Sequence, residues 1–586
     1  MNIIIDGKAH QAQAGESILV ACANAGINIP TLCYSKSIGV IGSCRVCVVQ
    51  VKGYRNLVTA CNTPVCEGME ISTNTTRVLD ARKTVLELLL SDHRLDCLKC
   101  VRSSDCRLKR ASENAGCNAE RFTRNKKFTE NDEGNSYIRR NNDKCILCGR
   151  CVRVCKNTQE VSVLAVNGRG FDSYIGCAWG KPLETVPCIS CGQCLVNCPT
   201  AALVEVDRLD LLKQKLNDPD IKVVIATAPS TRVAIGEGFG FEAGKDCTGK
   251  MVSALKKLGF HRVFDLNLAA DFTIMEEATE FLKRLGARDT FSMPMLTSCC
   301  PGWINYVRMY YPNLLGNVST TKSPQQILGA LVKSYYAEKA NLNPKKIFTV
   351  MLMPCVAKQS EADRIGDVDM TMTVTQAIRL IKEYNIDFAS LRDSNFDDPL
   401  GMSSGAGLIF GTTGGVMEAS LRTLSEKILN KRLDNIDFHN VRGERGIKVA
   451  SIPELRDPEG NPINVAVVSG MANAEKILKK ITCVKDDSGV QWECDKFHFI
   501  EIMACLGGCV NGGGMPVHNA HIQNNFANSM KRASTLYHMD QYNNLRRAHE
   551  NPTVKQVYDE YLGEQGSELA HKLLHTHYKK KEKYNK

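Results

Sequence analysis

Cysteine is the residue that most constrains the fold of this chain, which holds 27 cysteines among 586 residues. That is too many for an ordinary protein of a reducing compartment and, as a fraction, too few for a disulfide-stapled scaffold. The number is odd, and many of these residues stand in C-x2-C groups, so metal binding explains them better than paired disulfides. The length allows several domains, each with its own core. We therefore expect a multidomain protein that binds metal centres through thiolates.

The formal net charge of +11 at pH 7 would by itself suggest a nucleic-acid-binding surface. That value counts every Cys as neutral, whereas bound clusters and their thiolates would add about −9 in all. We therefore expect no nucleic-acid partner. No charged and apolar leader follows Met1, and the longest apolar run, Ile347–Ala357, is too short to span a bilayer. The sequence predicts a cytoplasmic protein without a membrane span, with an organelle as the alternative.

Periodicity divides the chain into four predicted parts, of which the first two are small. Residues 1–78 carry short β-rich runs, Asn2–Ile5 and Val46–Val51, around a Cys loop, which predicts a ferredoxin-like domain. Residues 79–125 are predicted to form a helical domain. From Thr76 to about Leu108, the apolar spacing predicts one buried helix face made of Val78, Leu79, Ala81, Val85, Leu86 and Leu89.

The other two parts are a Cys-rich block and a long α/β region. Residues 126–208 begin within a polar stretch, Ala111–Lys144, that we expect to be a linker, and their compact part, Asn141 to about Asp207, contains an internal repeat of Cys groups. In residues 209–586, predicted strands alternate with helices, which indicates a parallel α/β fold with ligands at the carboxyl ends of strands. The predicted strands are Lys222–Ala226, Phe291–Leu296, Lys346–Leu352 and Ile463–Val468.

Two groups of metal ligands are predicted before residue 110. The first has the spacing C-x10-C-x2-C-x13-C and favours a [2Fe–2S] cluster, with structural zinc as the alternative; it comprises Cys33, Cys44, Cys47 and Cys61. The second has the spacing H-x3-C-x2-C-x5-C and comprises His93, Cys97, Cys100 and Cys106. A neutral imidazole in place of one thiolate removes a negative charge, so a cluster at the second group would be easier to reduce.

The Cys-rich block repeats the run C-x2-C-x2-C-x3-C, which is typical of bacterial ferredoxins with two [4Fe–4S] clusters. In that run the fourth Cys ligates the other cluster. One predicted ligand set is therefore Cys145, Cys148, Cys151 and Cys198. The other is Cys188, Cys191, Cys194 and Cys155.

The remaining Cys motifs lie far apart along the α/β region. They are Thr297–Trp303, Met353–Cys355 with Lys358 and Glu361 after it, and Glu501–Cys509. The first two follow predicted strands. By spacing alone, the four thiolates of Cys300, Cys355, Cys505 and Cys509 could hold one further [4Fe–4S] cluster.

These three segments resemble the three signature motifs of the [FeFe]-hydrogenases, and the similarity runs over nearly the whole chain. The N-terminal series of Cys groups resembles that of the large clostridial enzymes. The runs Arg82–His93 and Leu573–Tyr578 resemble the catalytic subunit of NAD(P)-linked, multisubunit hydrogenases. The resemblance implies ferredoxin-like domains followed by a two-lobed α/β domain with the site in the cleft. It also implies reversible interconversion of two protons and two electrons with H2.

The resemblance further implies an H-cluster. This centre is a cubane joined to a two-iron unit with CO, CN⁻ and azadithiolate, and the cubane would be held by Cys300, Cys355, Cys505 and Cys509. By position in the motif, Cys509 is the bridging ligand. Cys299 would stay a free thiol that relays protons, and Lys358 would donate to a cyanide. Met353 and Met503 would supply polarizable packing. Dedicated maturation proteins would assemble the centre.

A route for protons is expected on one helix after Asp271. Glu277, Glu280 and Arg284 are spaced to share a helix face, although a solvated charged face explains that spacing equally well. The resemblance implies a path through Cys299, Glu277, Ser319, Glu280 and Arg284.

The sequence leaves the electron partner and two rival functions open. The resemblance implies either ferredoxin or flavin- and NAD(P)-binding subunits as partner. The run Gly405–Gly411 does not fit a dinucleotide-binding motif, so we expect no such site in this chain. The rivals are a non-catalytic iron–sulfur electron-transfer subunit and an H2 sensor. Leu506 and Met515 depart from the family pattern, and His571, His575 and His577 are expected to be surface or packing residues.

Overall fold

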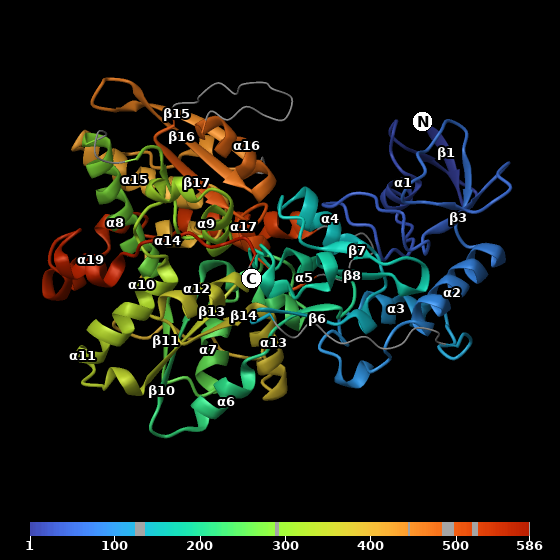
Figure 1. The fold of residues 1–586 in the computed structure, drawn as a ribbon, viewed down its shortest axis with the longest axis horizontal. Helices are drawn as coiled ribbons and strands as arrows, with labels where there is room; N and C mark the ends of the chain where they lie inside the picture. The colour runs from blue at the N-terminus through green and yellow to red at the C-terminus, as the bar shows by residue number, and fades with distance from the viewer. Residues whose placement is uncertain (124–134, 288–291, 444–445, 483–496, 518–524, 585–586) are drawn as a thin grey trace.

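The computed structural model describes the chain except for residues 124–134, 288–291, 444–445, 483–496, 518–524 and 585–586. The N-terminal segments form a smaller body beside a larger one that contains the C-terminal region (Figure 1). None of the described helices is both long and apolar enough to cross a bilayer.

The first domain is a five-stranded sheet in the order β2-β1-β5-β3-β4. Its strands are β1 (Asn2–Ile5), β2 (Lys8–Gln11), β3 (Val48–Val51), β4 (Val58–Thr59) and β5 (Glu70–Ser72), and helix α1 (Ile18–Asn24) packs on them. Ile3 and Ile5 alternate inward, as one buried sheet face requires. The strand prediction over Asn2–Ile5 is therefore confirmed.

The helical part is shorter than predicted, and its buried face is only partly the predicted one. Helix α2 (Thr76–Ser91) ends well before Leu108, and a separate helix α3 (Arg107–Asn114) follows. Val78 and Leu86 are buried as predicted, whereas Leu79 is 51% exposed. Arg82, Glu87 and Leu90 are buried as well, although they were not predicted to be. The prediction counted only apolar residues, whereas Arg82 is buried because its guanidinium donates two hydrogen bonds to the carbonyl of Val48.

The Cys-rich block folds around two short helices, α4 (Arg150–Asn157) and α5 (Gln193–Asn197), which contact each other. Its strands form the antiparallel pair β6 (Ile138–Arg140) and β9 (Leu203–Glu205), and the hairpin β7 (Ala165–Asn167) and β8 (Tyr174–Gly176). The predicted linker Ala111–Lys144 begins within α3, and its central residues 124–134 lie outside the described part of the chain.

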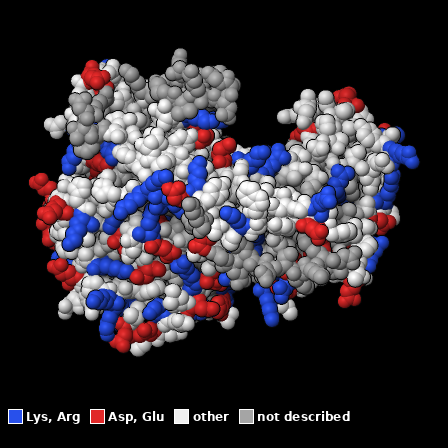
Figure 2. All heavy atoms as spheres, viewed as in Figure 1, with Lys and Arg blue, Asp and Glu red and all other residues white. Residues whose placement is uncertain are grey.

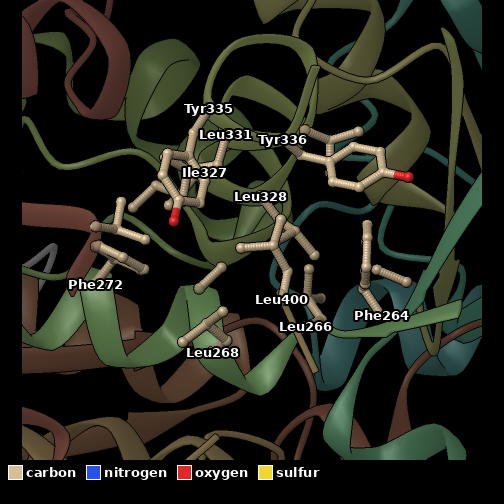
Figure 3. Packing of buried hydrophobic residues seen from close by; sticks show 14 of the residues in the cluster. Phe264, Leu266, Leu268, Phe272, Ile327, Leu328, Leu331, Tyr335, Tyr336 and Leu400 are labelled. Carbon is tan, nitrogen blue, oxygen red and sulfur yellow. The ribbon is translucent and has the colours of Figure 1, made fainter. Parts of the chain in front are cut away.

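The first lobe of the large body is a parallel sheet in the order β11-β10-β13-β14. Its strands are β10 (Lys222–Thr227), β11 (Arg262–Asp265), β13 (Ile347–Met353) and β14 (Met370–Thr373). Val223 and Ile225 enter one core with helix α7 (Thr248–Lys257), whereas Val224 and Ala226 enter a second core with helix α10 (Pro324–Leu331), shown in Figure 3. Helices therefore cover both faces of this sheet, as a parallel sheet requires.

The second lobe is a mixed sheet in the order β12-β17-β16-β15, in which only β15 runs antiparallel to its neighbour. The strands are β12 (Met295–Leu296), β15 (Ile447–Arg456), β16 (Pro462–Ser469) and β17 (Phe499–Met503). One face packs against helices α9 (Pro301–Tyr310) and α16 (Met471–Thr482), and the other against α8 (Asn267–Gly286) and α15 (Gly415–Leu429). Of the predicted strand Phe291–Leu296, Phe291 lies outside the described residues, while the other three predicted strands are confirmed.

Helix α8 connects the lobes, because its first half packs against the core of the first lobe and its second half against that of the second. The other helices of this body are α6 (Leu209–Asn217), α11 (Ala337–Lys339), α12 (Ala357–Ile365), α13 (Val374–Glu383), α14 (Gly405–Ile409), α17 (Asn525–Gln541), α18 (Pro552–Val557) and α19 (Glu568–Leu574). On the face shown in Figure 2, acidic and basic side chains are interspersed and form no broad basic patch.

A buried ion cluster between α15 and α17 tests how firmly the second lobe is held. Arg422 donates to both carboxylate oxygens of Asp540 at 2.8 Å and to Glu418 at 2.8 Å, and its side chain is fully buried. We expect Arg422→Met to destabilise the chain by about 3–5 kcal/mol, because Asp540 and Glu418 each lose a buried guanidinium and keep only the partly exposed Arg546 and Arg442. Thermal unfolding measures this, with the exposed Arg432→Met as control. Equal melting temperatures for the two variants would contradict it.

Candidate active site

The carboxyl ends of strands from both lobes surround one buried cavity of about 80 Å³. Ala228 follows β10, Met353 ends β13, Cys299 lies just beyond β12, and Met503 ends β17. The three predicted Cys motifs therefore meet at this cavity, although they lie far apart along the chain. Parallel strands favour this arrangement, because the loops after them converge at one edge of a sheet.

Four cysteines of these motifs line the cavity: Cys300, Cys355, Cys505 and Cys509. Burial, and then the neighbouring Cys300, raises the pKa of the Cys509 thiol to about 12, and burial raises the pKa of Cys505 well above its usual value. Two donors already reach these sulfurs. The backbone N–H of Ala504 lies 3.3 Å from Cys300 Sγ, and Gln193 Nε2 lies 3.2 Å from Cys505 Sγ.

Two glycines let the backbone approach closely beside these thiols. Gly508 has φ +94°, and a Cβ there would lie 2.5 Å from the backbone nitrogen of Thr413. A Cβ at Gly512 would lie 2.3 Å from the carbonyl oxygen of Pro354. A larger residue at Gly512 would push the chain after Cys509 away from Pro354, next to Cys355, and one at Gly508 would push the third motif away from Thr413.

The donor set of the cavity fits an iron–sulfur centre better than a single metal ion. Among the described residues, no three His, Cys, Asp or Glu side chains converge as they would around one ion. A cubane holds its four thiolates at separate corners, so wider spacing is what such a cluster needs. The cavity also contains a cation, Lys358, that can balance the negative charge of thiolates.

Lys358 is held at the cavity wall by three hydrogen bonds from its Nζ. They go to the carbonyl of Cys299 at 3.0 Å, to Ser323 Oγ at 2.9 Å and to Glu361 Oε2 at 2.8 Å. Burial disfavours the ammonium, but the charge and hydrogen bond of Glu361 outweigh that effect and raise the pKa of Lys358. The group therefore carries a fixed positive charge at neutral pH.

Cys299, at the cavity, and Glu277, on α8, are two buried groups whose pKa values are raised. Cys299 lines the cavity and is 8% exposed, and burial together with the charge of Glu277 raises its pKa well above the usual value. Glu277 is fully buried, and burial and the charge of Glu280 raise its pKa to about 8. Neither carboxylate oxygen of Glu277 has a hydrogen bond of normal geometry among the described residues.

The rest of the predicted path is hydrogen-bonded in the predicted order. Ser319 Oγ donates to Glu280 Oε2 at 3.0 Å, and Arg284 donates to Glu280 Oε1 from Nη2 at 2.6 Å and from Nε at 3.0 Å. Burial opposes ionisation of Glu280, but Arg284 outweighs it and lowers the pKa of this carboxyl. Two glutamates one turn apart thus prefer different protonation states, an arrangement suited to passing a proton.

Some residues at the cavity were predicted and others were missed. Met353 and Met503 both line it and are 2% exposed, whereas Leu506 and Met515 are not among its lining residues. Sequence reasoning missed Gln193 and Ser323, which contact Cys505 and Lys358. Gln193 lies between two Cys of the ferredoxin run, and only its tertiary position relates it to the cavity.

The Cys-rich block contains two further cavities whose linings match the predicted interleaving. One is lined by Cys145, Cys148, Cys151 and Cys198, and the other by Cys155, Cys188, Cys191 and Cys194. Cys191 also lines the cavity between the lobes, beside Cys300, Cys355 and Cys505. The two sites therefore lie next to each other.

Within each of the two N-terminal ligand groups, the structure brings residues close together. Cys33, Cys44, Cys47 and Cys61 are all buried, the backbone N–H of Cys44 donates to Cys33 Sγ at 3.5 Å, and hydrogen bonds from the Cys44 and Cys61 thiols lower the pKa of Cys33. His93, Cys97 and Cys106 line a common cavity of about 350 Å³. Cys100 lies in the same loop but is not part of that lining.

Profiles of known families match the chain along most of its length. The family described as iron only hydrogenase large subunit, C-terminal domain, matches residues 221–513, and iron hydrogenase small subunit matches residues 527–581. A 2Fe-2S iron-sulfur cluster binding domain matches residues 1–76, and a 4Fe-4S binding domain matches residues 138–157. The NADH-ubiquinone oxidoreductase-G iron-sulfur binding region matches residues 82–121.

Individual proteins give the same result. The chain is 43% identical to NADP-reducing hydrogenase subunit HndD of Solidesulfovibrio fructosivorans, over 100% of this chain and 99% of that protein. It is 41% identical to iron hydrogenase 1 of Clostridium pasteurianum, over 99% and 100%. A solved variant of [FeFe]-hydrogenase HydA1 from Chlamydomonas reinhardtii superposes with a TM-score of 0.55 and 38% identity, over 64% of this chain and 99% of that one. The chain therefore belongs to the [FeFe]-hydrogenases, enzymes that interconvert protons and electrons with H2 at an H-cluster.

Proposed function

We propose that this chain is the catalytic subunit of a multisubunit, NAD(P)-linked hydrogenase and that its reaction takes place in the cavity between the lobes. The observation that carries this proposal is the convergence there of four thiols, one further thiol and one buried ammonium. Cys300, Cys355, Cys505 and Cys509 would hold the H-cluster, with Cys509 bridging to a two-iron unit that carries CO, CN⁻ and azadithiolate. When bound, that centre supplies the redox chemistry of H2.

The side chains around the centre would position it and balance its charge. Lys358, held by Glu361, Ser323 and the carbonyl of Cys299, lines the cavity, and its ammonium would donate to a cyanide in place of one of these three hydrogen bonds. Met353 and Met503 would fill the space around the two-iron unit with polarizable, apolar contacts. Water would be excluded, because the cavity lies between two packed lobes.

Protons would pass between the cavity and the surface along α8. Cys299 holds a proton on sulfur at neutral pH, and Glu277 holds one on a carboxyl with a pKa of about 8. Ser319 would connect Glu277 to Glu280, which Arg284 keeps ionised. The alternation of neutral and charged carriers allows a proton to move in either direction at small cost.

Electrons would travel through four accessory clusters, one [2Fe–2S] and three [4Fe–4S]. The first two would be those on the four N-terminal cysteines and on His93, Cys97, Cys100 and Cys106. The interleaved sites of the Cys-rich block would follow, because the site with Cys191 adjoins the cavity between the lobes. Gln193 donates hydrogen bonds to Cys505 Sγ and to the carbonyl of Asn511, and so connects the two centres.

The rival functions are less well supported. An electron-transfer subunit would have no use for Cys299 and Lys358 in a closed cavity, and an H2 sensor would have no need of a continuous relay to Arg284. The identity to a protein named NADP-reducing hydrogenase subunit supports a flavin- and NAD(P)-binding partner over free ferredoxin. Cytoplasmic location and assembly by maturation proteins complete the proposal.

The relay role of Cys299 predicts that Cys299→Ser loses H2 turnover by at least about 100-fold. The reason is that a serine hydroxyl is a much weaker acid than a thiol and releases its proton less readily. Its iron content should equal that of the wild type, since Cys299 is not a proposed ligand. Gas chromatography of H2 from a reduced dye and iron analysis measure both. Cys66→Ser, at an exposed cysteine, serves as control. An active Cys299→Ser enzyme would refute the relay.

The protonation of Glu277 predicts a pH-dependent stability. In the unfolded chain this carboxyl ionises near pH ~4.3, whereas in the folded chain its pKa is about 8. Between these values only the unfolded state releases the proton, so stability falls as pH rises from 5 to 8. Glu277→Gln lacks this loss, and its stability relative to wild type should rise by a few kcal/mol over that range, at about 1.4 kcal/mol per pKa unit.

Thermal unfolding of the metal-free chain between pH 5 and pH 8 measures this difference. Glu67→Gln, in the first domain, is the control with the opposite direction of pKa shift. Because hydrogen bonds from Asn2 lower the pKa of Glu67, its contribution is complete above the unfolded value and constant over this range. Parallel stability curves for Glu277→Gln and the wild type would contradict a neutral Glu277.

The proposed partner predicts that the isolated, fully loaded chain reduces a viologen dye with H2 but forms no NADPH from NADP⁺. The reason is that the run Gly405–Gly411 forms the buried helix α14 and offers no phosphate-binding loop. Absorbance at the wavelengths of dye and NADPH distinguishes the two products. NADPH formed by the chain alone would overturn the need for a partner.

A further inference from the structure

A second set of hydrogen bonds leaves the proposed proton path at Glu280 and leads into the C-terminal segment. Thr320 Oγ1 donates to Glu280 Oε2 at 3.1 Å and lies 2.8 Å from His575 Nδ1. On the other side of the ring, His575 Nε2 lies 3.0 Å from Glu276 Oε2. One imidazole thus connects two glutamates of α8.

The backbone fixes this histidine firmly. His575 caps the end of α19 and forms a bridge with Thr321, and the N–H of Thr576 donates to the carbonyl of Thr320 at 2.7 Å. The His575 side chain is 5% exposed. The prediction of a surface or packing role for this residue missed the polar contacts on both ring nitrogens.

The partners of Glu276 determine which proton the ring carries. Tyr558 OH donates to Glu276 Oε1 at 2.5 Å, and the N–H of Gly566 donates to Oε2 at 3.1 Å. His575 Nε2–H can donate to this same carboxylate, which already accepts from Tyr558 and Gly566. The state of Nδ1 is then decided by the one hydroxyl proton of Thr320.

That hydroxyl can serve either neighbour, but not both. When His575 is neutral, Thr320 donates to Nδ1 and Glu280 loses a donor. When His575 is protonated, Nδ1–H donates to Thr320 and the hydroxyl donates to Glu280. Moving the imidazolium proton to Thr320 while the hydroxyl proton goes to Glu280 Oε2 leaves neutral His575 and a protonated Glu280. No proton is gained or lost in this exchange.

A titratable group stands at the outer end of this branch. The exposed ring of His571 stacks on His575 with centroids 4.2 Å apart. The other charged groups that face the pair are Lys283 and Arg284, beside Glu276 and Glu280 on the same helix. Arg284, by contrast, holds a proton that guanidinium does not release.

We infer that Thr320 and His575 form a second branch of the proton relay, which joins the path through Arg284 at Glu280 and extends toward the exposed His571. This inference rests on the proposed function, because it adds a branch to the proposed relay. Its distinctive property is that the exchange needs an imidazolium at position 575 and a hydroxyl at position 320, so the branch contributes less as the pH rises.

The test compares H2 evolution from a reduced dye by fully loaded His575→Gln and wild-type enzyme between about pH 5.5 and pH 8.5. We expect the variant to lose about threefold in rate at the acid end and nothing at the alkaline end. Iron content and melting temperature should match those of the wild type. His577→Gln, at an exposed neighbouring histidine, is the control.

Thr320 provides a second pair of variants in case His575→Gln destabilises the segment. Thr320→Ser keeps the hydroxyl and should retain the wild-type pH profile, whereas Thr320→Val should reproduce that of His575→Gln. Infrared spectra of the carboxyl region add a readout independent of turnover, since Thr320→Val should shift the protonation of Glu280 and Thr320→Ser should not.

Three outcomes would overturn the branch. A loss of rate by the same factor at every pH would assign His575 a structural role only. Identical profiles for Thr320→Ser and Thr320→Val would exclude the hydroxyl. Full activity of Glu280→Gln would remove the proposed relay itself and the branch with it. Loss of activity in Glu280→Gln together with a wild-type profile in His575→Gln would overturn the branch alone.

Discussion

Burying negative charge is the physical constraint on which the rest of this structure depends. Iron is bound by thiolates, the ionised form of cysteine. Burial at the cavity between the lobes disfavours that form and raises the pKa values of the thiols, to about 12 for Cys509. A positive charge must therefore stand beside them. Lys358 provides it, and the buried Glu361 and Ser323 keep that ammonium charged and aimed at the cavity. The backbone at Gly508 lies close to Thr413 and that at Gly512 lies close to Pro354, and these contacts hold the chain on both sides of Cys509 in place.

Protons and electrons reach the cavity from different elements of the fold. The proposed proton path follows α8, whose side chains carry Glu277, Glu280 and Arg284 between the two lobes. The proposed electron path arrives from the Cys-rich block, where Cys191 lines the cavity wall and Gln193 contacts Cys505. Separate routes let each be tuned alone, because a change in the relay alters no cluster ligand.

The C-terminal region takes part in this organisation. Residues 527–581 match the iron hydrogenase small subunit, and in this chain they are continuous with the large-subunit region. Their last helix ends at His575, which contacts both Thr320 and Glu276. A segment that is described as a subunit of its own in the family thus lies directly against the proposed relay, and covers the side of α8 that would otherwise meet water.

The sequence by itself determined whatever depends on neighbours along the chain. The C-x2-C runs fix ligand spacing within one loop, so both interleaved ferredoxin sites, three strands of the α/β region and the helix after Asp271 could be predicted from local patterns. For the distant thiols, such as Cys300 and Cys505, spacing allowed no more than one further [4Fe–4S] cluster, and only the resemblance to a family implied an H-cluster there. Tertiary structure alone decided the buried face of α2, the contact of Gln193 with Cys505 and the two partners of His575. These depend on how separate elements pack, and polar groups such as Arg82 are buried only where that packing supplies a partner.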